Sequence, residues 1–142
     1  MDPASKTYLS SCDGLTITLD YKASSASILI RGQAGPFQRM ISNLLYNAIK
    51  YTPEKGRIAI EISDQDSLCR ISISDTGIGI SAEDLPKIFK RFYRTDASRT
   101  EPGHGLGLSL VSAIAEAHGG KVFCTSTQGK GSTFTVELPR SP

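Results

Sequence analysis

Residues 36–51, PFQRMISNLLYNAIKY, decide the fold of this chain. Apolar side chains recur here at the three- and four-residue spacing of an amphipathic helix. They are Phe37, Met40, Ile41, Leu44, Leu45, Ala48 and Ile49. Pro36 suits the first turn of such a helix, and Pro53 and Gly56 end it. The segments on both sides of this helix then determine the architecture.

Most of the remaining segments alternate between apolar and polar residues, which predicts strands with one buried face. Two strands are expected before the helix, at Leu15–Tyr21 and Ile28–Ile30. After it we expect strands at 57–64, 68–75, 121–127 and 132–138, helices at 82–92 and 108–118, and a loop at 94–103. Gly119 and Gly120 are typical of a helix C-terminus and close the last helix.

The predicted order does not alternate strand and helix, so a doubly wound parallel sheet fits it poorly. Paired strands separated by single helices favour a mixed, mostly antiparallel sheet with its helices packed on one face. We therefore expect an α/β protein with the architecture of a two-layer sandwich.

Length and composition limit the class of protein. The 142 residues suit one domain, placed at 15–138 with tails at 1–14 and 139–142. Hydrophobic residues make up 39% of the chain, and the net charge is only +2. These values favour a soluble domain without nucleic-acid or direct membrane contact. Three widely spaced cysteines form no disulfide framework, which indicates a reducing compartment, the cytoplasm. Whether a parent protein is membrane-anchored stays open.

A polar stripe runs along the first helix. Asn43, Asn47 and Lys50 are spaced i, i+4 and i+7, so they share one face. Asparagine is a poor helix former, and two amides in line with an ammonium suit a magnesium ion and a phosphate. An ordinary polar helix face explains the same residues about equally well.

Two glycine-rich segments stand at the ends of predicted elements. Residues 75–80, DTGIGI, follow a strand and combine a carboxylate with glycines that permit tight turns. Residues 103–108, GHGLGL, open a helix whose N-terminal N–H groups can bind an anion. Taken alone, the first segment suits a plain turn and the second is a weak phosphate signal.

In combination, these segments resemble the motifs of sensor histidine kinases. Residues 43–52 resemble the N box, 75–79 the G1 box, 88–94 the F box, 103–107 the G2 box and 129–134 the closing hairpin. The chain is thereby similar, over about 15–138, to the catalytic and ATP-binding domain of these kinases. The wider superfamily includes gyrase, MutL and the 90-kDa heat-shock chaperone ATPases. The resemblance implies the Bergerat fold, an α/β sandwich.

The resemblance also implies a role for each matching residue on the adenine side of the site. Asp75 would accept a hydrogen bond from the adenine amino group, with Gly77 and Gly79 bordering the base. Thr133 would support the adenine site through its hydroxyl group, and Tyr51 would pack beside adenine or ribose.

On the phosphate side, Asn47 would be the main Mg²⁺ ligand, with Asn43 beside the metal. Lys50 and Arg94 would contact phosphates. The lid that closes on the triphosphate would contain Gly103, Gly105, Leu106 and Gly107. The implied cofactors are ATP and Mg²⁺.

The implied activity is transfer of the γ-phosphoryl group to a histidine on a separate dimerisation domain, in two-component signalling. Neither His104 nor His118 has the acidic neighbour of the family's acceptor motif, so that domain is expected outside this chain. The isolated chain is expected to be monomeric, and the parent a homodimer that also meets a response regulator. Two alternatives remain open: a free-standing ATPase of the superfamily, and a nucleotide-binding interaction module without phosphoryl transfer.

Overall fold

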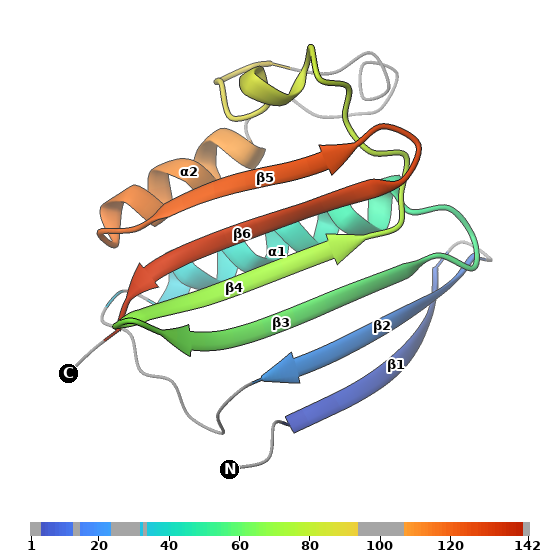
Figure 1. Ribbon diagram of the computed structural model, residues 1–142, viewed down its shortest axis with the longest axis horizontal. Helices are drawn as coiled ribbons and strands as arrows, with labels where there is room; N and C mark the ends of the chain where they lie inside the picture. Colours follow the sequence, from blue (N-terminus) through green and yellow to red (C-terminus); the bar gives the residue numbers. More distant parts are fainter. Residues whose placement is uncertain (1–3, 13–14, 24–31, 33, 94–106, 141–142) are drawn as a thin grey trace.

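The computed structural model describes residues 4–12, 15–23, 32, 34–93 and 107–140 (Figure 1). The elements are β1 (Ala4–Cys12), β2 (Leu15–Ala23), α1 (Ala34–Tyr51), β3 (Arg57–Gln65), β4 (Leu68–Asp75), a 3-10 turn (Leu85–Lys87), α2 (Gly107–Ala117), β5 (Lys121–Thr127) and β6 (Gly131–Pro139).

The strands form one sheet in the order β1-β2-β3-β4-β6-β5. Among the described strands only β2 and β3 pair in parallel, and the other four pairs are antiparallel. A parallel pair needs a long crossover connection, and α1 lies between β2 and β3 in the sequence. The prediction of a mixed, mostly antiparallel sheet is confirmed.

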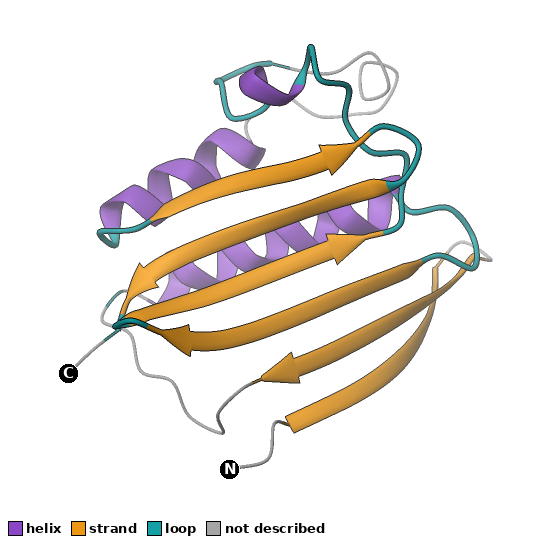
Figure 2. Ribbon diagram, in the orientation of Figure 1, coloured by secondary structure: helices purple, strands orange, loops and turns teal. Residues whose placement is uncertain are grey.

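Both long helices cover the same face of the sheet (Figure 2). The buried stripe of α1 consists of Met40, Leu44 and Ala48, at the four-residue spacing that keeps side chains on one side of a helix. These residues belong to one apolar cluster with β4, β6 and α2. Because each layer buries its apolar side against the other, the predicted two-layer sandwich is confirmed.

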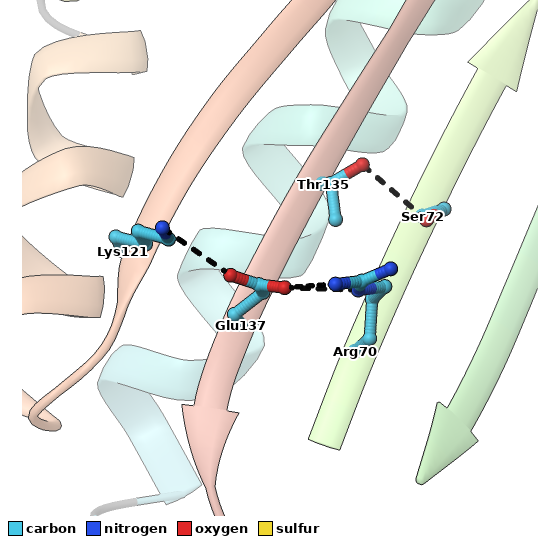
Figure 3. A network of polar contacts seen from close by, with 5 residues as sticks. All are labelled: Arg70, Ser72, Lys121, Thr135 and Glu137. Carbon is cyan, nitrogen blue, oxygen red and sulfur yellow. Dashed lines mark hydrogen bonds and ion pairs between the residues drawn. The ribbon is translucent and has the colours of Figure 1, made fainter. Parts of the chain in front are cut away.

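No helix of the described residues covers the opposite face of the sheet (Figure 2), which is mainly polar on β4, β6 and β5. Arg70, Glu137 and Lys121 lie in register across β4, β6 and β5. Figure 3 shows Glu137 between the two cations. Arg70 donates to the Glu137 carboxylate through Nε at 3.0 Å and also through Nη2, and Lys121 Nζ lies 3.6 Å from Oε1. We call these three residues the charged row.

The predicted bounds of β4 and β5 agree with the structure, whereas the prediction of a tail at 1–14 does not. Residues 4–12 form β1, which pairs with β2 along its whole length. The segment is mostly polar, and an edge strand is held by backbone hydrogen bonds that leave no hydrophobic pattern in the sequence. At the other end, β6 reaches Pro139, and Arg140 N donates to Ser67 O at 2.9 Å.

The helix predicted at 82–92 is wrong, because only the 3-10 turn 85–87 forms there. Ser81 and Asp84 bond to each other through side chain and backbone, and Pro86 cannot donate a backbone hydrogen bond. The apolar residues still reach the core, where Phe89 meets Phe134 edge-on at 6.1 Å between ring centroids. The strand expected at 28–30 and the loop expected at 94–103 lie outside the described residues.

Candidate functional site

The polar stripe of α1 flanks the buried stripe of the same helix. Asn43, Asn47 and Lys50 are each partly exposed, whereas Leu44 and Ala48 between them are buried. Asn43 Nδ2 donates to the carbonyl oxygen of Gly107, the first residue of α2, at 3.4 Å. The structure therefore brings the stripe to the start of the second helix, 64 residues away in the sequence.

The end of α1 meets the loop that follows β4. Ile78 N donates to the carbonyl oxygen of Tyr51 at 3.2 Å. Lys50 Nζ lies 5.3 Å from the centre of the Tyr51 ring, within the range of a cation–π interaction. The predicted phosphate-side and base-side residues are thus adjacent at this helix end.

Asp75 ends β4 on the face that carries the buried residues Ile71 and Ile73. Its Oδ1 accepts a hydrogen bond from Gly77 N at 2.9 Å. Burial raises the pKa of the Asp75 carboxyl group, and backbone hydrogen bonds from Gly77 and Ser132 oppose that rise. Within the described residues no cation forms an ion pair with Asp75. A half-buried carboxylate held by backbone groups can accept a further hydrogen bond from a neutral donor such as an amine.

The same loop contacts the turn between β5 and β6. Gly129 N donates to the carbonyl oxygen of Ile78 at 2.7 Å. Gly79 has a φ of 71°, a left-handed conformation in which an added Cβ would collide with the Thr127 carbonyl oxygen. Glycine is required there by conformation and by space.

Thr133, predicted at the base, is not brought together with Asp75. Its Oγ1 lies 2.9 Å from Ser74 Oγ, on the helix-free face. Ser132 is the residue paired with Asp75, and it is buried, with 7% of its surface exposed. Strand alternation could have found it, because Ser132 shares its face with the buried Phe134 two residues later.

Four predicted residues, Arg94, Gly103, Gly105 and Leu106, lie outside the described residues. Of the predicted lid, only Gly107 is described, as the first residue of α2. Leu108, which follows it, packs against the apolar cluster.

The described residues contain no cluster of three or more His, Cys, Asp or Glu side chains that could hold a metal ion. Asparagine is not among these residue types, and the side-chain amides of Asn43 and Asn47 offer oxygen atoms that suit a magnesium ion. Because Asn43 uses its NH₂ group toward Gly107, its carbonyl oxygen is left for a cation. Oxygen ligands are what Mg²⁺ prefers, usually with phosphate and water completing the shell.

The chain matches the family described as histidine kinase-, DNA gyrase B-, and HSP90-like ATPase over residues 32–142. It is 42% identical over 105 residues to the sensor histidine kinase WalK of Bacillus subtilis, covering 71% of this chain and 17% of that protein. It is 38% identical over 124 residues to the phosphate regulon sensor protein PhoR of Pseudomonas aeruginosa, covering 86% of this chain and 27% of that protein. The chain thus spans less than a third of the length of these relatives.

Solved structures agree with this. The mycobacterial sensor histidine kinase MprB superimposes with a TM-score of 0.77 at 28% identity, covering 87% of this chain and 85% of that one. Full-length ShkA in complex with AMPPNP gives 0.77 at 32% identity, covering 88% of this chain and 26% of that one. None of the described helices is long and apolar enough to cross a membrane. The matched segment contains α1, the loop after β4 and the β5–β6 turn, and the chain therefore belongs to the family of histidine kinase-, DNA gyrase B- and HSP90-like ATPases.

Proposed function

We propose that this chain binds Mg²⁺-ATP and supplies the γ-phosphoryl group for phosphorylation of a histidine on a separate dimerisation domain. The observation that carries the proposal is the half-buried Asp75 carboxylate, held by backbone groups and without an ion-pair partner among the described residues. The similar ShkA structure is a complex with AMPPNP, an ATP analogue, which supports the choice of nucleotide.

On the base side, Asp75 accepts a hydrogen bond from the adenine amino group, with Gly77 and Gly79 beside the ring. Ser132 takes the supporting role that the resemblance implies for Thr133, because the Ser132 side chain lies on Asp75's side of the sheet and that of Thr133 lies on the other side. Tyr51 packs beside adenine or ribose, since its backbone already joins the loop at Ile78.

On the phosphate side, Asn47 and Asn43 provide amide oxygens for Mg²⁺, which neutralises phosphate charge when bound. Lys50 and Arg94 contact the phosphates. The predicted lid residues Gly103, Gly105, Leu106 and Gly107 close over the triphosphate.

The contribution of these residues is positioning and charge neutralisation, because phosphoryl transfer leaves little covalent chemistry to the protein. A neutral imidazole nitrogen of the acceptor histidine forms the new N–P bond while the bond from Pγ to the bridging oxygen breaks, and ADP leaves with that electron pair. In a longer cytoplasmic or membrane-anchored homodimer, the phosphohistidine would then serve a response regulator.

A free-standing ATPase is less well supported. Relatives of that kind use a glutamate to activate water, and the corresponding residue here is Asn43, whose amide cannot accept a proton as a base. The other alternative, a nucleotide-binding module without transfer, needs the same base site and differs only in the reaction.

Radiolabelled γ-ATP tests the proposal, first with the chain alone and then with an added acceptor domain from a homologous kinase. Label is expected on the acceptor histidine of the added domain, and almost none on the chain itself. Nδ1 of His118 lies 2.8 Å from the carbonyl oxygen of Ile114, which holds this ring against its own helix. Release of free phosphate without labelled histidine would favour an ATPase, and binding without either product would favour a binding module.

A further inference from the structure

Ser126, which is not among the predicted site residues, makes three hydrogen bonds next to the loop that follows Asp75. Ser126, near the end of β5, is partly buried, and its Oγ has three polar neighbours. They are Ile80 N at 2.8 Å, Gly131 O at 2.9 Å and Ser132 Oγ at 2.8 Å. A serine hydroxyl can donate one hydrogen bond and accept two, so these contacts saturate it.

Only one arrangement of protons satisfies all three contacts. The Ile80 amide can only donate to Ser126, and the Gly131 carbonyl can only accept from it. The proton of Ser126 therefore points to Gly131, and Ser132 must donate its own proton to Ser126. The Ser132 oxygen then offers only lone pairs to other groups. Because Ser132 is paired with Asp75 across β6 and β4, two acceptor groups lie side by side on one face of the sheet.

The three contacts also join segments that are distant in the sequence. Ile80 follows the glycine loop, and Gly131 and Ser132 begin β6, which pairs with the end of β4. Gly131 packs so closely there that an added Cβ would collide with the Asp75 carbonyl oxygen. Ser126 thus holds the loop and the start of β6 together directly behind Asp75.

We propose that Ser126 is a positioning residue for base selection, which fixes the loop at Ile80 and turns Ser132 into an acceptor. This inference rests on the proposed function, because it assumes that a purine lies against Asp75. The 6-amino group of adenine can donate hydrogen bonds to the Asp75 carboxylate and the Ser132 oxygen. The 6-oxo group of hypoxanthine would instead place a third acceptor against these two. Ser126 therefore favours ATP over inosine triphosphate, which differs from ATP in carrying oxygen at that position.

The test compares Ser126→Ala with Ser126→Thr and with Ser74→Ala as matched control. Threonine keeps the hydroxyl and suits a strand. Ser74 bonds a β6 hydroxyl in the neighbouring register position, on the opposite face.

Calorimetry with ATP and with inosine triphosphate, both with Mg²⁺, gives the affinity ratio. Ser126→Ala should weaken ATP about tenfold, the scale of one lost hydrogen bond with an orphaned partner. The ratio should fall about fivefold, recover in Ser126→Thr and stay unchanged in Ser74→Ala.

Hydrogen exchange of the nucleotide-free chain provides an independent readout. The Ile80 amide should exchange faster in Ser126→Ala and return to the unmodified rate in Ser126→Thr. If Ser126→Ala does not fold, Ser126→Cys keeps the size with a weak acceptor and should show the same changes. An unchanged affinity ratio with an unchanged Ile80 rate would overturn the inference. Failure of the unmodified chain to bind ATP would instead overturn the proposed function, and it would remove the base-selection part of this inference with it.

Discussion

Two carboxylates on neighbouring strands of one sheet are treated in opposite ways. Glu137 lies in the charged row on the helix-free face, where Arg70 and Lys121 neutralise it. Its pKa is lowered, chiefly by the hydrogen bond from Arg70. Asp75 lies on the helix face, and its pKa is raised by burial. Glu137 is thus neutralised by two cations, whereas Asp75 has no ion-pair partner among the described residues. We propose that the Asp75 carboxylate keeps an acceptor available for a ligand, because groups with shifted pKa values cluster at functional sites.

The largest expected effect is on nucleotide affinity. Asp75→Asn keeps the shape but replaces a charged acceptor with a neutral amide, so ATP binding should weaken by about 1.5–3 kcal/mol, roughly 10- to 150-fold. Glu137→Gln is the matched control and should leave the affinity unchanged. Calorimetry measures both variants. Equal losses of ATP affinity in the two variants would show that the two carboxylates do not differ in function. An unchanged ATP affinity of Asp75→Asn would show that Asp75 does not contact the base.

The next largest effect is expected at Asn47 on α1, which we propose as a ligand of Mg²⁺. Asn47→Ala should lower the Mg²⁺-dependent part of ATP affinity by about tenfold, the scale of one lost ligand contact. ADP binding in EDTA should change little. Ser42→Ala, an exposed position of the same helix, is the control. If binding with and without metal falls equally, Asn47 does not act through the metal.

A smaller effect concerns stability. Glu137→Gln removes a charge that two cations share, but Arg70 is 45% exposed and water can replace much of the interaction. The loss should be about 1 kcal/mol, or roughly 3–5 °C in Tm. Asp75→Asn should not lower Tm, since it removes a half-buried charge that has no ion-pair partner in the described residues. Thermal unfolding at pH 7 distinguishes the two, and a larger loss in Asp75→Asn would contradict the comparison.

The smallest effect is a difference in pH dependence. The lowered pKa of Glu137 contributes stability that is present above its unfolded pKa and is lost as pH falls through the folded pKa. The raised pKa of Asp75 contributes stability that is present below its unfolded pKa and is lost as pH rises through the folded pKa. Urea unfolding between pH 3 and 6 should therefore show a shallower acid loss in Glu137→Gln and a steeper one in Asp75→Asn. Identical profiles would show that neither shift affects stability.

The sequence predicts this molecule best where periodicity is strong. The apolar stripe of α1 and the alternation in β4 identify both elements, because burial on one face leaves a pattern. It fails at β1, whose mostly polar residues pair through the backbone, and near Pro86, where apolar spacing suggests a helix that the local hydrogen bonds prevent. Composition cannot detect either effect.

The candidate site is predictable by type more than by position. The structure joins Asp75 to Gly77 and Asn43 to Gly107 by hydrogen bonds, whereas their roles at a ligand stay predictions. The motif resemblance points to Thr133, which lies on the other face, because one residue of offset reverses the face in a strand. Ser126 has no signal in the sequence, since a hydroxyl that bonds three distant groups becomes visible only once the chain is folded.

Ile78 is 44% exposed, yet its two backbone groups bond Tyr51 and Gly129. Residues from three distant parts of the chain therefore meet through the peptide groups of one position. A library of substitutions at Ile78 should tolerate most side chains, with proline as the exception because it removes the N–H. A circular permutant opened in the exposed turn 128–130 would cut beside Gly129, although such turns are the usual choice for new termini. New termini at 128–130 should therefore lower the stability of the domain more than the exposure of this turn suggests, because Gly129 donates a hydrogen bond to Ile78.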